Sequence, residues 1–241
     1  MKALFLILLV ACAKPAGGPL TNTFDNTRLA SIALDQKQAV AEAQQQHDIA
    51  QQQHTKAEND YRDSEIEQEV AEYQAEHSVL VSQLVGTRLN DKARPGTETA
   101  QLARRTADAK VEFTRARREW LRALTNSTLY GVYAAQAKLE LERARLAQTS
   151  GVTPAGFDLA GFEQQLVQRD RAAKAAADET DKQRQVAGAK LTAWNELERS
   201  FMQTSGMKGP SESERAVIDW KQAPPGVAPV ETAATPAPGK P

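Results

Sequence analysis

The sequence has little of what a thick hydrophobic core requires. Aromatic residues make up only 5% of its 241 residues, and its one cysteine stands at position 12. A single cysteine excludes a disulfide within the chain, and so few aromatic side chains argue against a substantial ligand pocket. The formal net charge is −1. A nearly neutral chain has no overall field that recruits nucleic acid, so we expect no nucleic-acid partner.

Proline is absent from residues 25–89 and again from residues 97–148. Alanine, glutamine, glutamate and arginine are abundant there, a composition typical of long helices and coiled coils. The segment NDKARPG, rich in turn-forming residues, separates these two stretches, and a similar segment, TSGVTPAG, follows the second. A third stretch comes after it, and Asp158 is placed to cap the start of a helix there. The sequence therefore predicts a helical domain over residues 25–204, with three long helices over about residues 25–89, 97–148 and 158–204.

The apolar residues of these stretches recur at alternating spacings of three and four, as at the contact positions of a coiled coil. In the first helix the expected contact positions, called the seam below, are Leu29, Ala33, Val40, Ala43, His47, Ala50, His54, Ala57 and Tyr61. The spacing then changes frame, and the seam is expected to continue at Ile66, Val70, Tyr73, His77, Leu80 and Leu84. The third helix has its own apolar stripe at Leu159, Phe162, Leu166, Ala173, Ala176, Thr180, Ala187, Leu191, Trp194 and Phe201. These patterns predict that each helix packs along a neighbour.

Folding the chain back about Ala93 pairs residues whose numbers sum to 186, for example Tyr73 with Phe113. In that register the acidic stretch 63–76 faces the basic stretch 110–123, and flanking charges of this kind select the partner and its direction in coiled coils. We therefore expect an all-α fold, an elongated antiparallel coiled-coil bundle of three long helices. The alternative is a helical hairpin whose third helix is partly free for a partner.

The end of the chain divides into two parts. Ser211 and Glu214 have the spacing of a capping box, which predicts a short helix within the linker of residues 205–222. Its apolar residues Val217, Ile218 and Trp220 are weak candidates for partner binding. The Trp220 side chain is suited either to anchoring a partner or to packing on the bundle. Residues 223–241 are rich in proline, and we expect them to form a disordered tail.

The chain opens MKALFLILLVACAKP, in which Lys2 precedes a run of eight apolar residues that is far shorter than the ~20 residues of a spanning helix. The stretch Leu9-Val10-Ala11-Cys12 resembles the lipobox of bacterial lipoproteins. The resemblance implies that residues 1–11 are a signal peptide, removed by cleavage before Cys12, and that Cys12 is then lipidated. The alternative is an ordinary signal peptide whose cleavage site happens to contain a cysteine.

Lipidation would attach the protein to a membrane through Cys12, because several acyl chains on one residue give firm anchoring. Residues 12–24 would then form the lipidated cysteine and a flexible tether, since KPAGGP contains several helix breakers. Ala13 rather than an aspartate follows the cysteine. In enterobacterial lipoproteins this implies export to the outer membrane. We expect the protein to face the periplasm, with the cell surface as the alternative.

No motif of a known chemistry is present. The sequence has no glycine-rich phosphate loop, nucleophile elbow, Cys-x-x-Cys or His-Glu-x-x-His, so we expect neither an enzyme nor a cofactor. The repeated unit AQQQH places His47 and His54 seven residues apart. That is ~10.5 Å along a helix, too far for both to bind one Zn²⁺ at ~2.0–2.1 Å, so they are weak metal candidates. Their expected neighbours across the hairpin, Leu139 and Val132, are not ligands.

These features together predict a lipid-anchored periplasmic coiled-coil protein with a structural or scaffolding role. We expect it to serve a cell-envelope, secretion or efflux assembly as an accessory subunit, with a protein partner. The alternative is a periplasmic binding module, either a helical chaperone or a metal or stress sensor. The arrangement of contact faces is compatible with a homo-oligomer as well as with a monomer.

Overall fold

The computed structural model describes residues 20–88, 95–207, 209 and 211–222. Cys12, the turn around Ala93 and the tail of residues 223–241 lie outside these ranges. The long helices are α1 (Gln38–Arg88), α2 (Pro95–Thr149) and α3 (Leu159–Ser205), and a short helix, α4 (Glu212–Gln222), follows them. Two short 3-10 helices, η1 (Asn26–Leu29) and η2 (Leu34–Lys37), precede α1. Every regular element in the described ranges is helical, which confirms the predicted all-α class.

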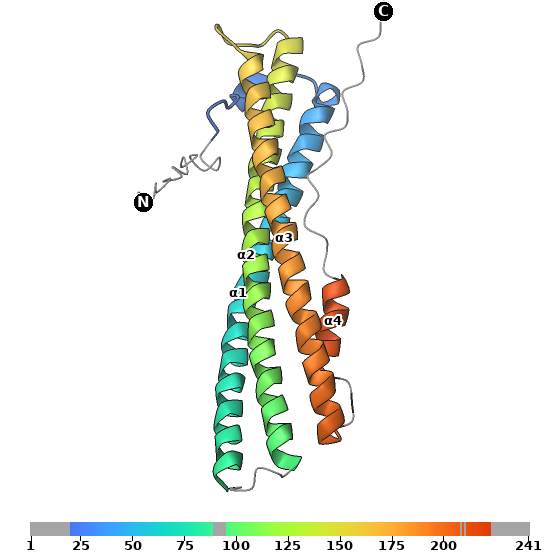
Figure 1. Ribbon diagram of the computed structural model, residues 1–241. Helices are drawn as coiled ribbons and strands as arrows, with labels where there is room; N and C mark the ends of the chain where they lie inside the picture. Colours follow the sequence, from blue (N-terminus) through green and yellow to red (C-terminus); the bar gives the residue numbers. More distant parts are fainter. Residues whose placement is uncertain (1–19, 89–94, 208, 210, 223–241) are drawn as a thin grey trace, which may run out of the picture.

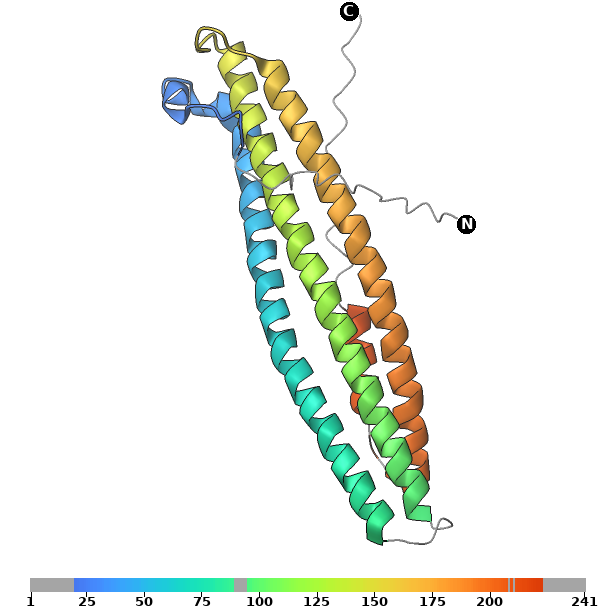
Figure 2. The same cartoon turned by 60° about the vertical axis from the view of Figure 1, so that its left-hand side comes forward.

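The three long helices lie side by side, and successive helices run in opposite directions (Figure 1). Helix α2 is central, because α1 and α3 both pack along it while α1 and α3 make no extensive contact with each other within the described ranges. Figure 2 shows the same order from a second direction, with α2 between its two neighbours. With 55 residues, α2 is roughly 80 Å long, so the molecule is an elongated rod.

The α1 face that packs on α2 is lined by small side chains at every seventh position. The buried residues are Ala43, Ala50, Ala57, Ser64 and Ala71. The Thr125 hydroxyl of α2 donates a hydrogen bond of 3.1 Å to the carbonyl oxygen of Ala57, which shows how closely the two helices approach. Small side chains permit this approach, and the contact is therefore narrow rather than filled by large apolar groups.

The predicted change of frame in the first helix is wrong. The seam continues unbroken through Ser64 and Ala71, whereas Ile66, Tyr73 and Leu80 are exposed. The predicted pairing of Tyr73 with Phe113 fails for the same reason, because Phe113 instead stacks on Trp194 of α3 with ring centroids 5.5 Å apart. Two sets of positions in this part of α1 have heptad spacing, and α2 packs against the set with the smaller side chains.

The hairpin register agrees with the predicted one to about a helical turn. His54 contacts Thr128, four residues before the expected Val132, and its Nδ1 atom lies 3.1 Å from the threonine hydroxyl. The acidic and basic stretches face each other as predicted. The ion pairs between them are Arg118 with Glu65, Arg117 with Glu67 and Arg115 with Glu72. Exposed pairs of this kind stabilise a fold by ~0–1 kcal/mol each, so they mainly select the pairing.

Helix α3 packs on α2 through the predicted stripe. Its buried residues include Phe162, Ala173, Thr180, Ala187, Leu191 and Trp194. The predicted N-cap is also present, because the Asp158 carboxylate accepts a hydrogen bond of 3.0 Å from the Ala160 amide. Gly206 ends the helix with a φ of 70°, a left-handed conformation that glycine adopts without strain.

The first long helix begins at Gln38 rather than near residue 25. The preceding segment turns across the end of the rod and buries Phe24, Leu29 and Ile32 against a cluster of Leu141, Ala144, Ala147 and Phe162. Leu29 was expected on the α1 seam. It instead closes the apolar end of the α2–α3 pair.

Candidate partner-binding surfaces

The segment that precedes η1 is held on the rod by one glutamine of α3. The buried Gln165 side chain accepts hydrogen bonds from the Thr21 and Asn22 amides, both at 2.9 Å, and from the Thr21 hydroxyl at 3.0 Å. Its own amide nitrogen donates to the Asn22 carbonyl at 3.0 Å. The glutamine therefore satisfies backbone groups of an extended segment more than 140 residues away in the sequence.

A buried carboxylate continues this docking. Glu140 of α2 accepts a hydrogen bond of 2.7 Å from the Phe24 amide, and its other oxygen accepts one of 2.7 Å from Arg143. A buried carboxylate is costly unless it is paired and hydrogen-bonded, and both conditions are met here. Residues 21–24, expected to be part of the tether, are thus docked at the α2–α3 end of the rod. Residues 13–19 lie between Cys12 and the first described residue, Leu20.

Helix α4 lies against the half of the rod that is distant from this docked segment (Figure 1). Its Trp220 ring meets Trp120 of α2 edge-on, with centroids 4.8 Å apart, and meets Phe113 at 6.3 Å. Val217 is partly buried in the same cluster, whereas Ile218 is exposed. Of the two roles considered for Trp220, the structure shows the packing role.

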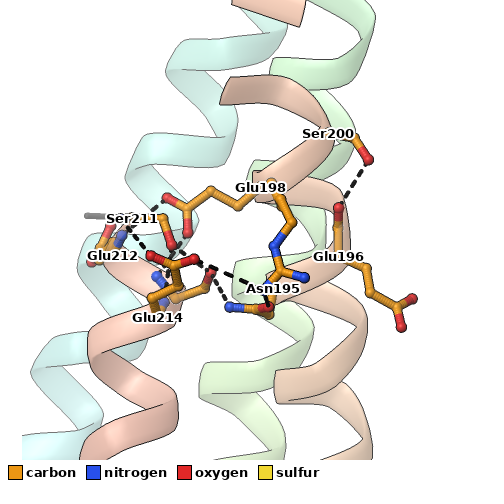
Figure 3. Close-up of polar contacts among 9 residues, drawn as sticks. Asn195, Glu196, Glu198, Ser200, Ser211, Glu212 and Glu214 are labelled. Atoms are coloured by element: carbon orange, nitrogen blue, oxygen red, sulfur yellow. Dashed lines mark hydrogen bonds and ion pairs between the residues drawn. The ribbon is translucent and has the colours of Figure 1, made fainter. Parts of the chain in front are cut away.

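Polar groups fix the start of α4 (Figure 3). The Glu214 amide donates to the Ser211 hydroxyl at 3.0 Å, and the Glu214 carboxylate accepts from the Ser211 amide at 3.4 Å, so the predicted capping box is confirmed. The Glu198 carboxylate of α3 accepts a further hydrogen bond of 2.7 Å from the Ser213 amide. The Ser213 hydroxyl in turn accepts a hydrogen bond of 3.0 Å from the Asn195 side chain of α3. Helix α4 therefore begins on a set of α3 side chains that satisfy its free amides.

The outward side of α1 carries large apolar side chains that no other part of the described chain covers. We call the set Ile66, Val70, Tyr73 and Leu80 the outer α1 face; these residues are 62%, 47%, 71% and 58% exposed. Isolated exposed apolar residues are ordinary, but several aligned on one helix make this face a candidate interaction surface. The α1 sequence thus has two heptad faces, and among the described residues only the small-residue face is packed against another helix.

The histidines lie apart from any cluster of metal ligands. The His54 ring contacts Thr128, and the nearest carboxylate to His47 is its neighbour Asp48, at 3.7 Å. In the described parts of the chain, no group of three or more histidine, cysteine, aspartate or glutamate side chains is arranged to hold a metal ion. A hollow of about 610 Å³ lies beside His54 and Tyr61, between α1, α2 and α3. Charged and amide side chains make up much of its wall, unlike the mainly apolar walls of small-molecule sites.

Three carboxylates have displaced pKa values, and two of them, Glu72 and Asp170, belong to the long helices. A hydrogen bond from Gln68, supported by Arg115, lowers the pKa of Glu72 on the α1–α2 interface. Partial burial raises the pKa of Asp170 on α3, and the charge of Lys138 opposes that effect. Neither group lies in an enclosed apolar pocket with a second titratable partner, the arrangement that acid–base catalysis uses.

Within the described ranges, no helix combines the length and the apolar character needed to cross a membrane. No family model, curated protein or solved structure matches the chain.

Sequence patterns identified some of these features and missed others. Local patterns revealed the capping box at Ser211 and the apolar residues of α4. The outer α1 face was visible as a heptad set but was assigned to the interior of the hairpin. The Gln165 and Glu140 contacts gave no local signal, because a buried glutamine or glutamate in a long polar helix looks like any other surface residue.

Proposed function

We propose that this chain is a lipid-anchored structural protein of the bacterial cell envelope that holds a helical rod off the outer membrane, facing the periplasm. In this role it is an accessory subunit that presents part of the rod to a protein partner. The observation that carries the proposal is the docking of Thr21 and Phe24 at one end of the rod, soon after the lipobox cysteine. It gives the rod a membrane-proximal end and a distal end.

The dimensions support this arrangement. The nine residue-to-residue steps from Cys12 to Thr21 span at most about 30 Å when extended. From the start of α1 to Ile66 is about 40 Å along the helix, and to Leu80 about 60 Å. The outer α1 face would thus stand well beyond the membrane surface, whereas the α2–α3 loop would lie near it. The rod has few large apolar side chains to form a pocket, which favours a scaffold over an enzyme.

Lipidation is tested in a Gram-negative host that expresses the full chain in the presence of a radiolabelled fatty acid. The parent should carry the label and sediment with the outer membrane. Cys12→Ser should lose the label and most of the membrane association, because the anchor is gone. Lys14→Ala, two residues away, should behave like the parent.

An unlabelled parent, or a Cys12→Ser protein that remains in the membrane fraction, would overturn the proposed anchor. Orientation is tested separately by the accessibility of engineered cysteines to a reagent that cannot cross the inner membrane. Labelling from the periplasm at an exposed site such as Ile218→Cys is expected in spheroplasts. Its absence would contradict the periplasmic location.

A further inference from the structure

We propose that the outer α1 face binds a basic amphipathic helix of a partner protein. The inference deepens the proposed scaffold function and rests on it for the existence of a partner. It does not depend on lipidation. Its foundation is the exposed apolar set together with the charges beside it.

The outer α1 face has the geometry of a coiled-coil seam. Ile66, Tyr73 and Leu80 recur every seven residues, and Val70 and His77 occupy the intervening positions. At ~100° per residue, Ile66 and Tyr73 lie about 180–200° around the helix from Ser64, the middle of the face that packs on α2. Helix α1 is therefore apolar on the side turned away from the rod, and an incoming helix can pack there without displacing α2.

One edge of this face is acidic. Glu69 and Glu76 are seven residues apart beside the apolar set, both are exposed, and neither forms an ion pair or hydrogen bond with another described residue. On the opposite edge Glu67 and Gln74 turn toward α2, where they are bound by Arg117 and Lys110. Arg62 precedes Glu69 by one heptad, so the acidic edge begins at Glu69. A partner helix with lysine or arginine beside its apolar positions matches this edge.

A second copy of the chain matches it less well. Antiparallel pairing about Tyr73 would place Glu69 of one copy opposite Glu76 of the other, which brings like charges together. Parallel pairing would place Glu69 opposite Gln74, which already accepts a hydrogen bond of 2.8 Å from Lys110, and would leave both acids without a cation. A lipid surface is also disfavoured, since anionic headgroups repel an acidic edge.

The test uses the full chain purified in detergent and two designed helical peptides of about three heptads each. Both peptides have isoleucine and leucine at the contact positions. One has lysine at the flanking positions and the other has glutamate. Binding is measured by fluorescence anisotropy of the labelled peptides. The lysine peptide should bind at least about tenfold more tightly than the glutamate peptide, a difference of ~1.4 kcal/mol.

Two variants of the protein locate the binding. Ile66→Ser combined with Tyr73→Ser removes exposed apolar groups, so the fold should persist while the affinity for the lysine peptide falls at least about tenfold. Val167→Ser combined with Val186→Ser, two exposed valines of α3, is the matched control and should bind like the parent. Glu69→Lys combined with Glu76→Lys should reverse the preference, so that the glutamate peptide binds better. Circular dichroism checks that each variant is folded.

Equal affinity for the two peptides, or binding that survives the Ile66 and Tyr73 substitutions, would overturn the inference. Sedimentation equilibrium examines the second copy: a dimer that Tyr73→Ser dissolves would show that the face pairs with itself, which also overturns the inference. These results are independent of the fatty-acid labelling of Cys12. Failure of the anchor and failure of this binding surface can thus be told apart.

Discussion

The ring of Trp220 meets the ring of Trp120 edge-on, with centroids 4.8 Å apart and planes inclined by 61°. The first belongs to the short helix α4 and the second to the central helix α2. Arg184 of α3 lies over the Trp220 ring, 5.8 Å from its centroid. One side chain therefore joins α4 to two of the long helices, and the docking of α4 can be tested at this position.

Trp220→Ala should release α4 from the rod. Truncating a well-packed tryptophan destabilises by about 3–5 kcal/mol in a closed core, and we expect about 1–3 kcal/mol here because Trp220 is only partly buried. Urea unfolding measures the loss, and faster amide hydrogen exchange confined to α4 would show local release. Ile218→Ala, on the exposed side of the same helix, should change stability by less than about 0.5 kcal/mol. Equal effects of the two substitutions would contradict the docked position.

Gly188 of α3 provides a graded test of the same contact. A Cβ atom there would lie 3.5 Å from the Trp220 ring nitrogen, an ordinary van der Waals distance. Gly188→Ala should therefore raise stability by about 0.5–1 kcal/mol, the usual gain of alanine over glycine within a helix. Gly188→Leu should push Trp220 away and lower the stability of α4.

Gly131 on α2 is the control, because nothing lies within 4 Å of a Cβ atom built there. Both Gly131→Ala and Gly131→Leu should stabilise the protein in thermal unfolding. A Gly188→Leu protein as stable as its alanine counterpart would show that Trp220 does not rest on this glycine.

Asp170→Asn should stabilise the protein at neutral pH, by less than about 1 kcal/mol because the side chain is only half buried. Burial raises the pKa of this carboxyl, so the folded state binds its proton more tightly than the unfolded state does, and stability falls as the pH rises from 3.8 through the raised value. The gain from asparagine should be complete above the raised pKa and should vanish below pH 3.8. Urea unfolding of the parent and the variant across this range provides the measurement. A gain that is constant with pH would mean that ionisation is not its source.

Gln165→Ala should detach the segment that contains Thr21 and Asn22. Four hydrogen bonds are lost together, and we expect a destabilisation of about 1–3 kcal/mol, reduced where water replaces the glutamine. Limited proteolysis should cut this segment sooner in the variant than in the parent. Gln164→Ala, at the exposed neighbouring position, should leave the cleavage rate unchanged. Similar cleavage rates in both variants would argue against a role of Gln165 in holding this segment.

The existence of the long helices could be predicted from the sequence because proline, glycine and capping residues mark their limits locally. The choice between two heptad frames in α1 could not. Ile66 and Tyr73 offer more apolar surface than Ser64 and Ala71, yet α2 packs on the smaller pair. Spacing shows that a face exists, but it does not show whether that face meets a neighbour within the chain or remains exposed.

The start of α1 was predicted too early for a related reason. Leu29 continues the heptad spacing, and nothing near it in the sequence signals that it caps a distant apolar cluster. That position depends on Leu141 and Phe162, which come from two other helices. Contacts between residues so far apart in the chain leave no periodic pattern, so they become visible only in three dimensions.

Gln165 and Glu140 together form a clamp that holds residues 21–24 on α2 and α3, and this clamp has a mechanical consequence. In the proposed arrangement, the membrane holds the chain before Thr21 and a partner holds it between Ile66 and Leu80. A pulling force between these two points is transmitted through Gln165 to α3 and through Glu140 to α2 before it reaches α1. Helices α2 and α3 therefore carry part of the force. The force then acts along the α1–α2 contact in shear, on many small contacts at once, instead of peeling α1 away from one end. The rod would thus resist tension far better than its narrow seam of alanine and serine suggests.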